Sequence, residues 1–178
     1  DRVEVGAGAF GVVMRTRWRG TVIAMKQLHR HLHHDEVAKA EFRTELKLMR
    51  QLHHPHVVQF LGTSVDQETS LVSLCFEFMH KGSLDQMFRK MYDEHTGAPT
   101  ITIAHAVEMA LDVARGMAYL HGRKPLPVIH RDLKPGNLML TRAGRVKIGD
   151  FGLSKTMSVR HKMPQVKGPF PPTTLRDD

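Results

Sequence analysis

The stretch "VIHRDLKPGNLML" (residues 128–140) places an acid, a base and an amide on a short segment between apolar flanks. The Pro-Gly pair in its middle excludes a continuous helix. The apolar residues on both sides indicate short buried strands. Asp132, Lys134 and Asn137 are therefore predicted to lie on a tight loop between hydrophobic anchors, and loops on rigid scaffolds are where chemistry is usually placed.

The composition is that of an ordinary globular protein. The chain has 178 residues, of which 41% are hydrophobic and 25% charged, enough for one domain with a hydrophobic core. No apolar run approaches the roughly 20 residues that a membrane span needs, and the first residues lack the pattern of a signal peptide. The single Cys75 excludes an internal disulfide and favours a reducing compartment, so we expect a cytoplasmic protein. The chain does not start with Met, which is consistent with a piece of a longer product.

The net charge of +8 raises the question of nucleic acid, acidic lipid or phosphate partners. The basic residues are scattered, however, and only 6% of the residues are aromatic, so no basic run alternates with stacking rings. We therefore expect no nucleic-acid partner. The 13 His residues include two groups, at 29–34 and 53–56, whose spacing fits no zinc pattern, and we expect solvated or capping side chains there.

The order of the predicted elements indicates a segregated α+β fold. Strands come first with one helix among them, and helices follow, which differs from an alternating βαβ pattern. The expected elements are three strands in 1–26, a helix at 35–52, strands at 56–65 and 71–79, helices at 82–92 and 101–122, and short strands at 138–140 and 146–150. The buried stripe of the long helix is expected to be Ala106, Ala110, Val113, Met117 and Leu120.

The segment "GAGAFG", from Gly6 to Gly11, is a G-x-G-x-x-G motif that has several interpretations on its own. A dinucleotide-binding turn requires a helix after the glycines, but the strand-like "VVMRTRWRG" follows here. An ordinary turn is the simplest alternative. A glycine hairpin between strands would instead let backbone N–H groups approach phosphates with no side chain in the way.

Lys26 and Glu45 each have a structural and a functional interpretation. Lys26 shares a strand face with Ala24, and it either reaches water at the edge or supplies a positive charge to a bound anion. Glu45 falls near the apolar side of the helix at 35–52, where a carboxylate needs a partner. That partner is either Lys26 or a neighbour on the helix, Lys47 or Arg43.

Asp150 stands between two glycines in the run "GDFG". A single Asp in such a position is usually part of a turn. An Asp and an Asn brought together beside a phosphate-binding loop would make a site of hard oxygen ligands, which suits Mg²⁺.

Taken in order, these motifs resemble the protein kinase family: G-x-G-x-F-G-x-V, A-M-K, a helix Glu, H-R-D-L-K-P-G-N and D-F-G. The resemblance covers the chain up to about Gly152. Lys134 resembles the serine/threonine-specific pattern, and "HHPHVVQFLG" and "GDFGLSK" are most similar to the tyrosine-kinase-like group.

The resemblance implies a kinase-like fold of three parts. A small antiparallel β N-lobe with one main helix and the hinge would occupy 1–79, the start of a helical C-lobe would occupy 80–152, and a partial, flexible activation segment would occupy 153–178. It also implies transfer of a phosphoryl group from ATP to Ser/Thr hydroxyls of proteins, with Mg²⁺ as cofactor.

The resemblance further implies roles for individual residues. Asp132 would accept the proton of the substrate hydroxyl, and Lys134 would steady the transferring group. Lys26 would bind the α/β-phosphates and pair with Glu45. Mg²⁺ would be held by Asn137 and Asp150. The implied nucleotide-binding residues are Gly6, Ala7, Gly8, Ala9, Phe10, Gly11, Val13, Ala24, Lys26, Glu77, Met79 and Met139. Phe78 would complete the hinge, and Phe76 would guard the back of the pocket.

The segment after D-F-G departs from the family pattern. It contains no A-P-E-like motif and no further helices, so we expect a kinase domain truncated there. The alternative function is a catalytically inactive nucleotide-binding or protein-interaction module. Hydroxyls placed where the family carries an activating phosphate are those of Ser154, Thr156, Ser158, Thr173 and Thr174.

Overall fold

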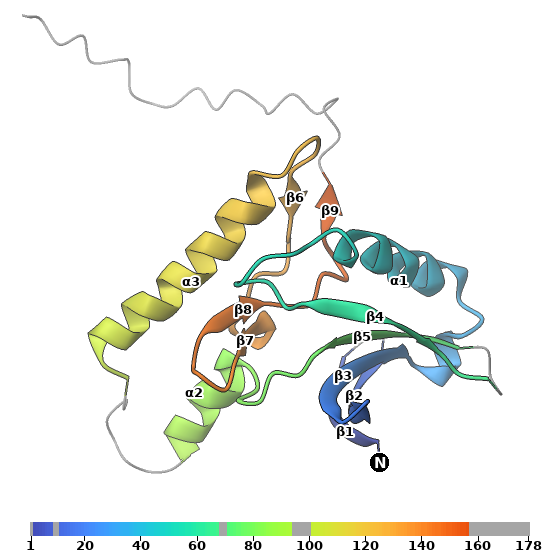
Figure 1. The fold of residues 1–178 in the computed structure, drawn as a ribbon, viewed down its shortest axis with the longest axis horizontal. Coiled ribbons are helices and arrows are strands. Elements are labelled where there is room, and N and C mark those ends of the chain that lie inside the picture. Colours follow the sequence, from blue (N-terminus) through green and yellow to red (C-terminus); the bar gives the residue numbers. More distant parts are fainter. Residues whose placement is uncertain (1, 9–10, 68–70, 94–100, 157–178) are drawn as a thin grey trace, which may run out of the picture.

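The computed structural model describes residues 2–8, 11–67, 71–93 and 101–156. Its largest element is a five-stranded antiparallel sheet in the order β1-β2-β3-β5-β4 (Figure 1). The strands are β1 Val3–Ala7, β2 Gly11–Trp18, β3 Thr21–Leu28, β4 Phe60–Val65 and β5 Val72–Glu77. The predicted strand, glycine loop, strand, turn and strand of the first 26 residues are thus confirmed.

The helix α1 spans Glu36–Met49 and begins where Asp35 caps it. The Asp35 carboxylate accepts hydrogen bonds from the backbone N–H groups of Val37 and Ala38, which the first turn of a helix leaves without partners. Phe42 and Glu45 are among its buried residues. The helix therefore places the carboxylate of Glu45 in the interior, beside the sheet.

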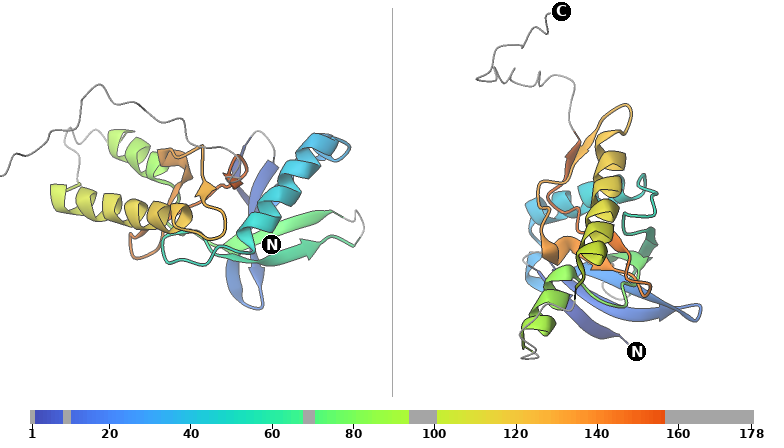
Figure 2. Two further views of the ribbon diagram at one scale, coloured as in Figure 1. Left: turned by 90° about the horizontal axis from the view of Figure 1, so that it is seen from above. Right: turned by 90° about the vertical axis from the view of Figure 1, so that its left-hand side faces the viewer.

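The remaining elements form the second part of the molecule. Figure 2 shows α2 and α3 at one end and the sheet with α1 at the other. The helices are α2 Leu84–Asp93 and α3 Ile103–His121, with 3₁₀ turns η1 Arg30–Leu32 and η2 Pro135–Asn137. Two small antiparallel pairs join β6 Val128–Ile129 with β9 Lys155–Thr156, and β7 Leu138–Leu140 with β8 Val146–Ile148. The short strands predicted on both sides of the Asp132 loop are β6 and β7.

A single buried cluster connects the two parts of the molecule. It contains residues from α1, α3, β6 and β8 together with the Phe of D-F-G, namely Leu48, Met49, Leu52, Val57, Leu120, Val128, Ile148 and Phe151. Because Phe151 is 1% exposed within this cluster, the position of the D-F-G turn depends on the packing of α1 and α3.

The predicted stripe of α3 is partly wrong. Ala106 and Ala110 are exposed, whereas Met109, Asp112, Gly116 and Leu120 are buried. The helix faces β8 through Gly116, where an added Cβ would lie 2.7 Å from the backbone oxygen of His56 and from Ile148 Cδ1. The prediction from the sequence considered only apolar residues, and it missed this face because the face includes Gly116 and Asp112.

Asp112 is buried because a set of donors surrounds its carboxylate. Arg145 forms two hydrogen bonds to it, and the backbone N–H of Val146 donates to Oδ2 at 3.0 Å. The Nδ1 atom of His56 lies 3.5 Å from Oδ1. The hydrogen bond from Arg145 is the main reason why the pKa of Asp112 lies below its ordinary value. The carboxylate thus ties α3 to the strand that leads into D-F-G.

Replacing Asp112 by Ala is expected to lower the free energy of unfolding by about 2–3 kcal/mol, because the buried N–H of Val146 then loses its partner. Denaturant unfolding of the purified protein measures this loss. Glu108→Ala, on the exposed side of the same helix, is the control and should change stability by less than about 0.5 kcal/mol. Since the pKa of Asp112 is lowered, its contribution should disappear as the pH falls below the ordinary aspartate range. Equal losses in the two variants would contradict this account.

Two of the three His side chains in the 53–56 group, His54 and His56, make structural contacts, whereas His53 is exposed to solvent as expected. His54 stacks on Tyr119 with ring centres 4.7 Å apart, and His56 Nδ1 lies 3.1 Å from the backbone oxygen of Val146. Among the described residues, no group of three or more His, Cys, Asp or Glu side chains could hold a metal ion. In that same part of the chain, every helix is too short or too polar to cross a bilayer.

Candidate active site

A cleft of about 940 Å³ lies between the sheet and the second part of the molecule. The glycine turn, β3, α1, the segment 76–79, the Asp132 loop and the D-F-G turn all contribute to its walls. The predicted site residues that line it are Gly6, Ala7, Gly8, Gly11, Val13, Ala24, Lys26, Glu45, Glu77, Met79, Asp132, Lys134, Asn137, Met139 and Asp150. The other two, Ala9 and Phe10, lie outside the described residues. The structure therefore brings together every described residue that the motifs indicated.

The glycine turn leads from β1 directly into β2, so the dinucleotide-binding interpretation, which needs a helix there, is wrong. The backbone N–H of Gly8 donates to the oxygen of Gly11 at 2.9 Å. A Cβ added at Gly11 would lie 2.1 Å from the backbone oxygen of Gln27, whereas Gly6 and Gly8 face open space. Gly11 is thus required for close strand pairing, and at Gly6 and Gly8 no side chain stands between the backbone and the cleft.

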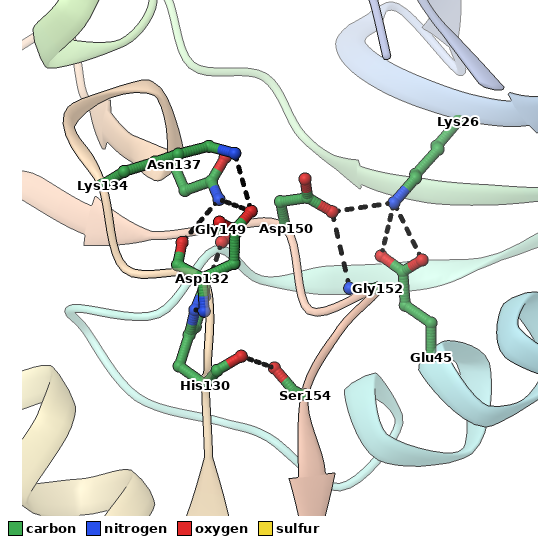
Figure 3. Close-up of polar contacts among 10 residues, drawn as sticks. All are labelled: Lys26, Glu45, His130, Asp132, Lys134, Asn137, Gly149, Asp150, Gly152 and Ser154. Atoms are coloured by element: carbon green, nitrogen blue, oxygen red, sulfur yellow. Dashed lines mark hydrogen bonds and ion pairs between the residues drawn. The ribbon is translucent and has the colours of Figure 1, made fainter. Parts of the chain in front are cut away.

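Lys26 lies between two carboxylates (Figure 3). Its Nζ atom is 2.9 and 2.8 Å from the two oxygens of Glu45 and 3.0 Å from Oδ1 of Asp150. Burial alone would lower the pKa of Lys26, but Glu45 and Asp150 together outweigh burial and raise it. Lys26 therefore remains a cation at neutral pH. The partner of Glu45 is Lys26 rather than Lys47 or Arg43, so the helix-neighbour interpretation is wrong.

Asp150 has one oxygen engaged and one oxygen free to bind another group. Burial opposes its ionisation, but the positive charge of Lys26 outweighs burial and holds the pKa of Asp150 below its ordinary value. Oδ1 also accepts a long hydrogen bond of 3.5 Å from the N–H of Gly152. Among the described residues, no hydrogen bond to Oδ2 is formed, and the side chain is 51% exposed toward the cleft.

The Asp132 loop is organised around the carboxylate of Asp132. Lys134 Nζ lies 2.8 Å from Oδ2, and Asn137 Nδ2 donates to Oδ2 at 2.9 Å and to the Asp132 backbone oxygen at 2.8 Å. The hydrogen bond from Lys134 is the main cause, and that from Asn137 a further cause, of a pKa of Asp132 below its ordinary value. Asp132 is therefore an anion at neutral pH and can accept a hydrogen bond from a hydroxyl.

Asn137 and Asp150 are suited to hold a hard cation. Asn137 donates through its nitrogen, which leaves its side-chain oxygen without a hydrogen bond within the described part of the chain. Asp150 contributes a carboxylate with one free oxygen on the same cleft. Carboxylate and amide oxygens are ligands that Mg²⁺ accepts while keeping several waters, so the two residues fit this ion.

Three contacts hold the Asp132 loop against the D-F-G turn, and sequence reasoning assigned none of them. His130, which is 1% exposed, places Nε2 2.9 Å from the backbone oxygen of Gly149. Its own backbone oxygen accepts a hydrogen bond of 3.1 Å from Ser154 Oγ (Figure 3). The His130 ring also packs edge-on against Phe151. The only sequence signal was the position of His130 at the start of the loop motif.

The backbone of both loops is strained where they meet. Arg131 and Asp150 are not glycines, yet they have φ angles of 66° and 55°. Such conformations cost on the order of 1–3 kcal/mol each and persist only where the surroundings enforce them. The hydrogen bonds of His130 and the burial of Phe151 supply that constraint.

Ser154 is not accessible as a modification site in this structure. The residue is 5% exposed, and its hydroxyl is used by the bond to His130. Thr156 is exposed at the end of β9. The other predicted hydroxyls, Ser158, Thr173 and Thr174, lie outside the described residues.

The segment 76–79 connects the two parts of the molecule and lines the cleft. One oxygen of the Glu77 carboxylate is engaged, because Oε1 lies 2.6 Å from Lys147 Nζ and accepts the backbone N–H of Gln59 at 2.7 Å. These contacts fix the Glu77 side chain against Lys147 and Gln59 at the wall of the cleft. Val13 and Ala24 lie above the cleft on β2 and β3, and Met139 lies on β7 on the other side.

The chain matches the family model described as protein tyrosine and serine/threonine kinase over residues 2–173. It is 41% identical to serine/threonine-protein kinase VIK of Arabidopsis thaliana over 159 residues, which is 88% of this chain and 34% of the relative. It is 40% identical to serine/threonine-protein kinase CTR1 of Arabidopsis thaliana over 85% of this chain and 18% of the relative. It is 38% identical to the probable serine/threonine-protein kinase drkB of Dictyostelium discoideum over 85% of this chain and 21% of the relative. The chain thus spans about a third or less of the length of these relatives.

Proposed function

The chain belongs to the protein tyrosine and serine/threonine kinase family, and on that premise we propose that it transfers a phosphoryl group from ATP to Ser or Thr hydroxyls of protein substrates. One observation supports the proposal most directly. The cleft brings together Asp132, Asp150 and Lys26, of which Lys26 and Asp150 are 124 residues apart in the sequence. The pKa shifts of all three side chains favour their charged forms. Phosphoryl transfer needs positioning and electrostatic stabilisation more than covalent chemistry, and this is what such a set of charges supplies.

We propose that the nucleotide base lies between Val13 and Ala24 on one side and Met139 on the other. The backbone of Glu77 and Met79 would bond the edge of the base, with Phe78 between them and Phe76 at the back of the pocket. The phosphates would lie under the turn formed by Gly6, Ala7, Gly8, Ala9, Phe10 and Gly11 and beside Lys26. This position is supported by the open cleft face of Gly6 and Gly8 and by the fixed cation of Lys26.

Asp132 is proposed to orient the substrate hydroxyl and to accept its proton. Its lowered pKa keeps it ionised, and Lys134 and Asn137 hold its carboxylate in one orientation. Lys134 is exposed beside it, so the ammonium is able to contact the transferring group as well. When bound, Mg²⁺ would neutralise charge on the phosphates, and Asn137 and Asp150 are the residues that would hold it.

The parts of the domain are proposed accordingly. The N-lobe and hinge correspond to 1–79, the start of the C-lobe to 80–152, and part of the activation segment to 153–178. ATP and a protein with an accessible Ser or Thr are the proposed partners, a cytoplasmic compartment is the proposed location, and no nucleic acid is proposed.

The direct test is transfer of labelled phosphate from Mg-ATP to a generic Ser/Thr protein substrate, followed by identification of the labelled amino acid. Label on Ser or Thr supports the proposal. Label on Tyr alone would overturn the assigned specificity. Tight Mg-ATP binding without any transfer would favour the alternative function, a nucleotide-binding or protein-interaction module without catalysis.

Replacing Asp150 by Asn is expected to weaken Mg-ATP binding by about tenfold or more, because a carboxylate ligand becomes a neutral amide. Calorimetric titration with Mg-ATP, and with ATP in the presence of a chelator, measures the change. ATP without Mg²⁺ should bind the variant and the wild-type protein with similar affinity. Equal loss of affinity with and without Mg²⁺ would show that Asp150 acts in some way other than through the metal.

A further inference from the structure

We propose that the α2 side of the cleft selects protein segments that carry acidic side chains about three to five residues from the accepting hydroxyl. This inference rests on the proposed function, because it names the class of substrate that the same site takes. It follows from the charges on one wall of the cleft and from the position of that wall beside the Asp132 loop.

The α2 wall of the cleft is basic. Lys81, Arg89 and Lys90 line the cleft, and all three are exposed to solvent. Gln86, one turn before Lys90 on the same helix, is the fourth member of this wall. Exposed cations at the mouth of a cleft attract anionic segments and repel cationic ones.

Most carboxylates along the cleft lie next to a cation outside the α2 wall, and Lys26 faces two of them, Glu45 and Asp150. Among the described residues, the pairs are Lys26 with Glu45 and Asp150, Lys147 with Glu77, and Lys134 with Asp132. Within α2, Arg89 is paired with Asp85, which does not line the cleft. The remaining lining acid is Glu41, which belongs to α1. Figure 1 shows α1 and α2 on opposite sides of the molecule. A segment that passes over α2 therefore meets mainly the positive charges of Lys81 and Lys90.

The wall is held rigidly next to the Asp132 loop. The helix α2 packs against the turn η2, which contains Asn137, and against β7. The backbone of Lys81 donates to the oxygen of Leu140 at 3.3 Å, and Leu140 donates to the oxygen of Gly82 at 2.7 Å. At the start of α2, the Ser83 side chain accepts the N–H of Gln86 while Gln86 Oε1 accepts the N–H of Ser83.

This packing sets how far a substrate must reach. Two packed elements lie roughly 10 Å apart, and an extended chain advances about 3.3 Å per residue. A hydroxyl at Asp132 and an acidic side chain at the α2 wall are therefore separated by about three to five residues. Because the cations are exposed, the expected preference is moderate, about fivefold to tenfold, and should weaken as salt is added.

The experiment compares three Ser-containing peptides with the purified protein. They are identical except that the positions three to five residues from the Ser carry Glu, Gln or Lys. The comparison is made once with these positions before the Ser and once with them after it. Phosphorylation gives kcat/KM, and fluorescence anisotropy of labelled peptides gives binding without requiring catalysis. The Glu peptide is expected to exceed the Lys peptide by about fivefold to tenfold in both measurements at low salt.

Lys81→Glu combined with Lys90→Glu should remove or invert that ratio. Lys47→Glu, an exposed site on α1 outside the cleft, makes the same change of charge at one position and should leave the ratio unaltered. Equal use of Glu and Lys peptides by the wild-type protein would overturn the inference and leave the proposed function standing. Selective binding of the Glu peptide without transfer would support the inference and count against the proposed function. A ratio that survives in the Lys81/Lys90 double variant would show that another surface selects the substrate.

Discussion

Replacing Asp132 by Asn is expected to lower kcat for phosphoryl transfer by about 10²–10⁴-fold and to leave the affinity for Mg-ATP within a few-fold of wild type. The amide cannot accept a proton from the hydroxyl, yet it has the shape of the carboxylate. Lys134 and Asn137 would still hold it in place, so the loop should keep its geometry. The loss should therefore appear in the chemical step rather than in nucleotide binding.

Single-turnover transfer and Mg-ATP titration on the same preparation separate the two effects. Glu36→Gln is the matched control, since Glu36 is also paired with a lysine, Lys39, but lies on the outer surface of α1. It should retain the wild-type rate. If Asp132→Asn lost nucleotide affinity as strongly as Asp150→Asn, the roles assigned to the two acids would be wrong.

Replacing Lys26 by Met is expected to reduce phosphoryl transfer by about 10²–10³-fold or more, because the variant loses a fixed positive charge beside the phosphates. The effect should extend to the protein itself. Glu45 is 5% exposed and would lose the cation that faces both of its oxygens, so it would be left buried or take up a proton. We therefore expect a lower unfolding temperature in addition to the loss of activity.

Lys147→Met provides the comparison that separates these two effects. Lys147 also makes a half-buried ion pair with a glutamate, Glu77, and it does not line the cleft. Its replacement should cost comparable stability but reduce transfer by no more than about tenfold. Equal loss of transfer in Lys26→Met and Lys147→Met would show that the ion pair matters only for folding and would remove Lys26 from the phosphate site.

The kinds of elements, their order and most of the candidate site could be predicted from the sequence. Glycine turns, helix caps and strand alternation are governed by neighbours a few residues away, and Asp35 and Ser83 show this by capping their own helices. The loop of Asp132, Lys134 and Asn137 was also predictable, because its contacts span no more than five residues.

Tertiary packing decided what local patterns left open. The sequence allowed Glu45 to pair with Lys47, Arg43 or Lys26, and the structure selects Lys26, which is 19 residues away. The buried face of α3 includes Asp112 because its partners come from the start of β8 and the residue before it, Val146 and Arg145, more than 30 residues later. A pattern that scores only hydrophobicity cannot anticipate a buried acid whose partners come from another element.

By itself, the sequence determined which chemical groups are present and which local conformations they adopt, because propensity and turn chemistry act over a few residues. Only the tertiary structure decided which of these groups meet. His130 and Ser154 support the D-F-G turn, and α2 lies beside the turn η2 of the Asp132 loop, because α3, β8 and α2 pack as they do. These contacts form because residues far apart in the sequence are buried in one shared core. A pattern of neighbouring residues carries no information about such distant partners.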